Sequence, residues 1–193
     1  MPFSQSIRFA TLAAVTLGVG VFAQSAQAQI SQSANGTVNV TVDNNITITP
    51  VDPMDFGTVA AVAAVGETAT LVIDTADSMT PTNTANAGFY PDGVTIPTSA
   101  TFNVEGPIGV NLDITLPAAP VAVDQSGGCV GTAPDFTLDT FVSNPTPTVA
   151  GLGTGNPTLV AVGATLKTDP GVVGTVAYES CLHTGTFVFT VGF

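Results

Sequence analysis

Apolar and polar residues alternate with a period of two along most of the chain that follows residue 28. The clearest stretch is residues 100–117, ATFNVEGPIGVNLDITLP, where Phe102 and Val104 alternate with polar neighbours up to the Gly106-Pro107 pair. The second half of the stretch, VNLDITL, alternates in the same way. This period gives each strand one apolar and one polar face, as in a sheet that covers a core on one side. The segment therefore predicts a β-hairpin.

The same pattern predicts strands elsewhere in the chain. They span residues 37–42, continued by Ile46 and Ile48 after a break, and then 68–74, 135–142, 158–167 and 184–193. Turn-rich loops are predicted at 75–97 and 143–157, and glycine and proline interrupt the chain too often for helices. We expect seven to nine short strands and no helix. The fold class indicated is all-β, an immunoglobulin-like or Greek-key β-sandwich.

The first 28 residues have the pattern of a secretory signal peptide. Arg8 supplies a positive charge, residues 9–22 are apolar, and Ala26-Gln27-Ala28 has the small residues of a cleavage site. An uncleaved membrane anchor would need roughly 18 apolar residues, which is more than this run provides. We therefore expect one domain over 29–193, secreted to the periplasm, cell surface or surroundings of a bacterium, with no transmembrane segment after cleavage.

Cationic side chains are almost missing from residues 29–193. This region contains Lys167, His183 and fourteen carboxylates, so its net charge is −13 when histidine is neutral. Nucleic acids and anionic lipids attract basic proteins, and phosphate or carboxylate sites commonly use arginine. General acid–base catalysis most often uses histidine. The composition predicts a protein that is not an enzyme, holds no cofactor or metal, and binds no nucleic acid.

Cys129 and Cys181 are the two cysteines of the chain. An even number in an exported protein predicts a disulfide. Closing a loop of this length contributes roughly 4 kcal/mol in the chain-entropy description. A redox or metal-binding thiol is the alternative, but the chain has no CxxC pair, and Cys181 and His183 would need two further metal ligands.

Two pairs of carboxylates, Asp52 with Asp55 and Asp74 with Asp77, are open to three interpretations. They could bind calcium, although no Asp-x-Asp-x-Asp-Gly loop is present. They could serve a glycosidase, although the chain has no tryptophan to line a sugar cleft. The third interpretation, a solvated acidic face, is the one favoured here.

Three segments together resemble an exported bacterial family known as domain of unknown function 4402. Residues 54–74, MDFGTVAAVAAVGETATLVID, resemble its opening, an apolar-Phe-Gly-Thr motif followed by a strand. Residues 100–117 resemble its central hairpin, and residues 162–193, which contain GTFVFTVGF, resemble its closing strand. The resemblance implies a secreted or surface-displayed all-β domain with a loose similarity to pilin-type immunoglobulin-like sandwiches.

The cysteines and the long loop at 75–97 depart from the usual pattern of that family. The family has no assigned activity, so the resemblance transfers no catalytic residue to this chain.

Two alternating segments are the candidates for a functional role. In the last predicted strand the alternating residues are Phe187, Phe189, Val191 and Phe193, and in the first they are Val38, Val40 and Val42. The last strand is either an ordinary strand of a closed sandwich or one wall of a groove that a neighbouring subunit fills by β-strand addition. The valines have the spacing that a donor strand needs.

The function indicated is therefore a non-catalytic, secreted or cell-surface structural protein. We expect fimbria-like assembly by strand addition, with copies of itself or related surface subunits as partners. The alternatives are a monomeric surface module for adhesion or ligand binding and, more remotely, a small secreted hydrolase using His183.

Overall fold

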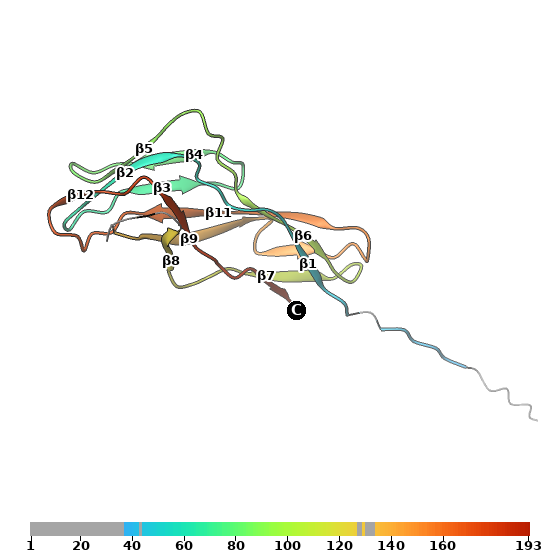
Figure 1. Cartoon of the computed structure of the whole chain (residues 1–193). Helices are drawn as coiled ribbons and strands as arrows, with labels where there is room; N and C mark the ends of the chain where they lie inside the picture. Colours follow the sequence, from blue (N-terminus) through green and yellow to red (C-terminus); the bar gives the residue numbers. More distant parts are fainter. Residues whose placement is uncertain (1–36, 43, 127–128, 130–133) are drawn as a thin grey trace, which may run out of the picture. The chain divides into compact units, whose positions relative to one another are not determined.

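The fold is organised around one long strand, β11 (Thr158–Lys167), in a computed structural model that describes residues 37–42, 44–126, 129 and 134–193 (Figure 1). Along one edge, the first half of β11 pairs with β6 (Ala100–Glu105) and the second half with β3 (Thr70–Ile73). Along the other edge it pairs with β9 (Phe136–Asn144). One strand thus joins two parts of the domain.

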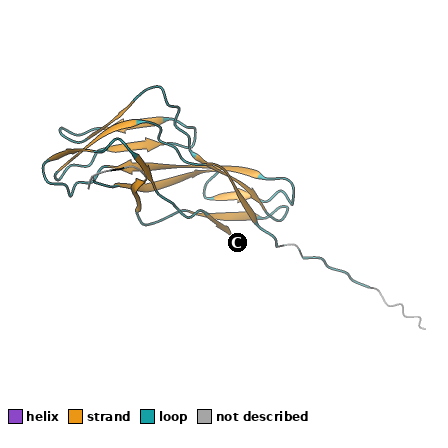
Figure 2. Cartoon of the chain, viewed as in Figure 1, coloured by secondary structure: helices purple, strands orange, loops and turns teal. Residues whose placement is uncertain are grey.

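The described residues form fourteen strands and no helix, which confirms the all-β prediction (Figure 2). The remaining strands are β1 (Thr47–Asp52), β2 (Val59–Ala64), β4 (Met79–Thr82), β5 (Gly88–Pro91), β7 (Asn111–Thr115), β8 (Val121–Ser126), β10 (Thr148–Ala150), β12 (Thr175–Ala177), β13 (Leu182–Thr184) and β14 (Thr190–Gly192). The main sheet has the order β1-β6-β11-β9-β8-β13, with β3 and β4 added beside β11. Two smaller sheets have the orders β10-β7-β14 and β12-β2-β5.

The main sheet packs against both smaller sheets and buries two apolar clusters. The first core cluster joins the main sheet to β2 and β5, and its buried members are Ala61, Ala64, Ala69, Leu71, Ala87, Phe89, Phe136, Leu138, Ala164 and Leu166. The second core cluster joins the main sheet to β7, β10 and β14, and its buried members are Ala100, Val104, Leu112, Val149, Val160, Val162 and Val191. Residues from facing sheets share each cluster, so the fold is a β-sandwich.

A β-bulge in β9 lies beside the junction of the two clusters. The register between β9 and β11 shifts between Gly163 and Thr165, and Thr140 within the bulge has φ of +51°. The extra residue changes the alternation of β9, so that Leu138 and Phe141 both contact core residues although they are three positions apart. The bulge thus lets one strand serve both clusters.

The predicted hairpin at 100–117 is wrong, because β6 and β7 lie in different sheets. Val104 of β6 and Leu112 of β7 are both buried in the second core cluster, and they reach it from opposite layers. The Gly106-Pro107 turn is therefore an arch between sheets. Alternation defines the apolar face of each strand but not its partner, so a hairpin and an arch share one sequence pattern.

Four further expectations need correction. Residues 37–42 are assigned to no strand, and of the strand expected at 184–193 only β14 and the last residue of β13, Thr184, are strand. The loops expected at 75–97 and 143–157 contain β4, β5 and β10, and the strand count exceeds the seven to nine predicted. These extra strands are short and carry proline or glycine nearby, so periodicity gave too little signal.

Residues 41–193 pack as one compact unit. The predicted signal peptide and its cleavage site lie outside the described residues. Within the described part of the chain, no helix is long and apolar enough to cross a membrane.

Candidate functional site

The C-terminal segment, residues 184–193, crosses from one layer of the sandwich to the other. It begins at the end of β13, which pairs with β8 in the main sheet, and it ends in β14, which pairs with β7 in a smaller sheet. Gly185 passes so close to β8 that an added Cβ would lie 2.6 Å from the carbonyl oxygen of Ala122. The close approach requires glycine at the point where the chain leaves the main sheet.

Two phenylalanines of this segment contact the second core cluster of their own chain. Phe187 packs against Phe102 of β6, with ring centroids 6.2 Å apart, and against Phe141 of β9, at 5.2 Å. Phe189 stacks on Phe102 with centroids 4.3 Å apart. The alternating apolar side chains of this segment thus face the core as far as Val191, which is buried. Phe193, the last of them, is 69% exposed.

The main chain of β14 has one unpaired edge, whose polar groups follow from its register with β7. The Ile114 N–H donates to the carbonyl of Pro147 at 2.8 Å, so the main-chain groups of Ile114 face β10. Neighbouring residues of a strand direct these groups to opposite sides, so those of Thr115 face β14 and bond with Thr190. Val191 pairs with Ile114, and its own N–H and C=O therefore point away from β7, onto the unpaired edge.

Three of the other six edge strands of the described sheets contain proline. Seven described strands have a single hydrogen-bonded neighbour: β1, β4, β5, β10, β12, β13 and β14. Three of them contain proline, namely Pro50, Pro81 and Pro91, and β10 follows Pro147. Glu179 lies between β12 and β13. Proline and charge are the usual means of preventing edge-to-edge association, and residues 184–193 contain neither.

The predicted donor residues are exposed. Val38, Val40 and Val42 are 86%, 78% and 72% exposed, in a segment assigned to no strand. Large aliphatic side chains with this exposure and a period of two remain available for burial in a partner.

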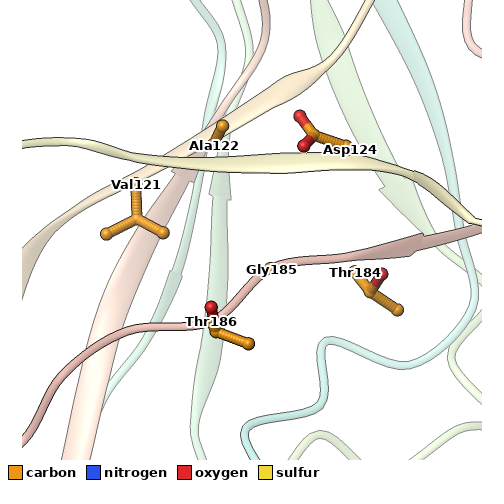
Figure 3. A pocket seen from close by; sticks show the side chains of 6 residues that line it. All are labelled: Val121, Ala122, Asp124, Thr184, Gly185 and Thr186. Carbon is orange, nitrogen blue, oxygen red and sulfur yellow. The ribbon is translucent and has the colours of Figure 1, made fainter.

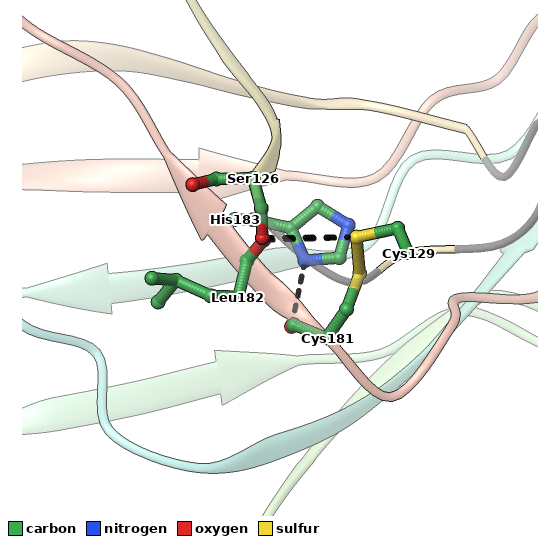
Figure 4. The surroundings of a disulfide bond; sticks show 5 residues. All are labelled: Ser126, Cys129, Cys181, Leu182 and His183. Atoms are coloured by element: carbon green, nitrogen blue, oxygen red, sulfur yellow. Dashed lines mark hydrogen bonds between the residues drawn. A yellow bond between two sulfur atoms is a disulfide. The ribbon is translucent and has the colours of Figure 1, made fainter.

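The predicted disulfide between Cys129 and Cys181 is present, with Cα atoms 5.6 Å apart (Figure 4). Beside it, Nδ1 of His183 lies 3.2 Å from the carbonyl oxygen of Cys181. The imidazole ring packs against Phe136 and Tyr178, and its Nε2 is buried without a partner among the described residues. No nucleophile or carboxylate is hydrogen-bonded to this histidine in the described part of the chain.

The carboxylates of the two predicted pairs accept hydrogen bonds within the fold. Asp55 accepts the Gly57 N–H in a local turn, and Asp52 accepts the hydroxyl of Thr101. Asp74 accepts the main-chain N–H groups of Ala76 and Ser78 at 2.8 and 2.9 Å. Asp77 accepts the Ser99 N–H at 2.6 Å, and this bond lowers the pKa of the Asp77 carboxyl below its usual value. Over the residues that the structure describes, no cluster of three or more His, Cys, Asp or Glu could hold a metal ion.

Two shallow hollows border the C-terminal segment. One, of about 400 Å³, is lined by Asp124 and Thr184, with Gly185 and Thr186 beside them (Figure 3). The other, of about 390 Å³, lies between residues 115–121 and 186–190, where β7 and β14 diverge. Both are open to solvent, and neither is lined by a cation or histidine.

These features define an all-β sandwich whose last strand leaves an unprotected edge. Residues 46–192 match the family described as Domain of unknown function (DUF4402). The chain belongs to this family, and the match includes β1, which the sequence resemblance had not covered. Neither the curated proteins nor the solved structures contain a match to the chain.

Proposed function

We propose that this protein is a secreted, non-catalytic structural subunit of the cell surface whose copies assemble by β-strand addition. The observation that carries the proposal is the pairing of two features in one chain. Residues 37–42 present an exposed row of valines outside any strand, and β14 offers an edge without proline or charge. Strand addition needs both features, since main-chain bonds give affinity and alternating side chains give specificity.

The composition supports an exported structural role. With Lys167 and fourteen carboxylates, residues 29–193 offer little to phosphate-bearing or anionic partners. The disulfide supports an oxidising compartment, where such bonds persist. Expression of the full chain in a bacterial host tests the location. We expect the protein in the envelope or medium, with Gln29 as the first residue on N-terminal sequencing.

Assembly is tested by changing the two faces of the candidate donor segment separately. A triple variant, V38D/V40D/V42D, places charge on the apolar face. Burying one valine contributes about 1.5–3 kcal/mol, so three aspartates remove most of the driving force. The matched control, T37D/N39D/T41D, adds the same charge to the polar face.

The measurement is light scattering after size exclusion, with electron microscopy of the largest fraction. We expect polymers of the unchanged protein and of the control, and monomers of the apolar-face variant. A protein that stays monomeric at every concentration would overturn strand addition and favour a monomeric surface module. Equal polymerisation of both variants would overturn it as well.

A further inference from the structure

We propose that the acceptor of strand addition is the unpaired edge of β14, and that its occupant is residues 37–42 of a second copy of this chain. The inference rests on the proposed function and names its partner surface. The central contact is with the main-chain N–H and C=O of Val191, which point away from β7. An incoming strand would bond to these groups.

Side-chain spacing supports the same edge. The side chain of Val191 points toward the second core cluster. In a strand added beside β14, the side chains opposite Val191 would point to the same face of the sheet. Val38, Val40 and Val42 recur with the two-residue period of Phe189, Val191 and Phe193. The added valines would thus continue the apolar face of the sheet β10-β7-β14.

The alternative edges are less suited to an extended partner. Proline lacks the N–H that strand pairing uses, and Pro50, Pro81 and Pro91 lie within β1, β4 and β5. The outward carbonyl of Ala150 in β10 already accepts the Thr158 hydroxyl at 3.1 Å. β13 begins directly after the disulfide at Cys181. The edge of β12 lies in a short uncharged run that ends at Glu179. Among the described edges, β14 thus follows the longest uncharged, proline-free segment.

The test measures amide hydrogen exchange in the V38D/V40D/V42D chain, which carries no functional donor of its own. The probe is a synthetic peptide of residues 35–45, NGTVNVTVDNN. We expect the Val191 amide to exchange rapidly without the peptide, because its N–H is unpaired, and to become protected when the peptide is added. A peptide with aspartate in place of its three valines is the control and should protect nothing.

A second measurement uses V191P, which removes the outward N–H without removing a bond between β7 and β14. We expect peptide affinity to fall about tenfold, as for the loss of one main-chain hydrogen bond together with a distorted edge. G192A is the matched control, because a Cβ there meets nothing within 4 Å and the residue does not need glycine's conformational freedom. It should bind the peptide as the parent does.

Protection of another edge, with the Val191 amide still exposed, would overturn the choice of β14 and leave strand addition intact. An unprotected Val191 amide in the peptide's presence overturns this inference even if V191P fails to fold. The polymer assay reports on the proposed function separately, so the two failures are distinguishable.

Discussion

Phe189 stacks on Phe102 with ring centroids 4.3 Å apart and planes inclined by 11°. The contact ties the C-terminal segment to β6 across the second core cluster, while the edge of β14 next to it stays unpaired. The segment is thus anchored by side chains on one side and open to main-chain bonding on the other. A strand that is both anchored and open is well suited to receive a partner without unfolding.

We expect F189A to lower the free energy of unfolding by about 2–3 kcal/mol, somewhat less than for a fully buried phenylalanine. F193A should change it by less than about 0.5 kcal/mol, because Phe193 is 69% exposed. Urea unfolding followed by circular dichroism measures both variants. Equal losses would show that the stack does not anchor the segment.

Thr140 has φ of +51° at the bulge of β9, a conformation that costs a β-branched residue free energy. T140G should therefore relieve this strain. After the entropy that glycine loses on folding is subtracted, we expect the free energy of unfolding to rise by about 0.5–1 kcal/mol. T137G, within the regular part of β9, should lower it. The same denaturation assay applies, and a destabilised T140G would contradict the prediction.

Glu67 gives the fold a dependence on acid. Its carboxylate accepts bonds from the Thr84 hydroxyl at 2.5 Å and from the side-chain and main-chain N–H groups of Asn86 at 2.7 and 2.9 Å. The Thr84 bond and the Asn86 bonds lower the pKa of Glu67 from 4.5 to about 2. A lowered folded-state pKa means that the stabilisation is complete above pH 4.5 and is lost as the pH falls toward 2.

The measurement for Glu67 is the melting temperature of the parent and of E67Q between pH 7 and pH 2. We expect the parent's advantage to be constant above about pH 5 and to shrink below it, because glutamine carries no charge to neutralise. An advantage that persists unchanged at pH 2 would contradict the assignment.

The placement of Lys167 predicts that the folded domain resists trypsin. It lies in β11 between Thr70 of β3 and Thr137 of β9, and its ammonium is 2.6 Å from Oδ2 of Asp139. Cleavage after Lys167 therefore requires these strands to separate. We expect no cut in the folded chain after signal-peptide removal, and rapid cleavage once it is unfolded in urea.

The same digest tests the disulfide. Residues 168–193 contain Cys181, so the bond to Cys129 should hold the two tryptic fragments together without reductant. Denaturing gels with and without reductant provide the measurement. Fragments that separate without reductant, or two thiols that react in the unfolded and unreduced protein, would contradict the bond.

The hydrophobic pattern predicted the positions of the two longest strands, β9 and β11, but failed at residues 37–42, where an alternating segment forms no strand. The expected range 158–167 coincides with β11, and the pairing of Cys129 with Cys181 followed from their number and the expected compartment. Short strands such as β4 and β12 escaped detection, because three or four residues carry too little periodicity.

The all-β class, the family and the scarcity of cationic side chains in residues 29–193 follow from the sequence alone. Which strands are neighbours depends on the folded chain, because alternation is local whereas pairing joins residues far apart in the sequence. In the folded chain, the segment between Val104 and Leu112 is an arch between two sheets and not the predicted hairpin. The sheet order also shows that several edge strands contain proline, whereas the edge strand that contains Val191 does not.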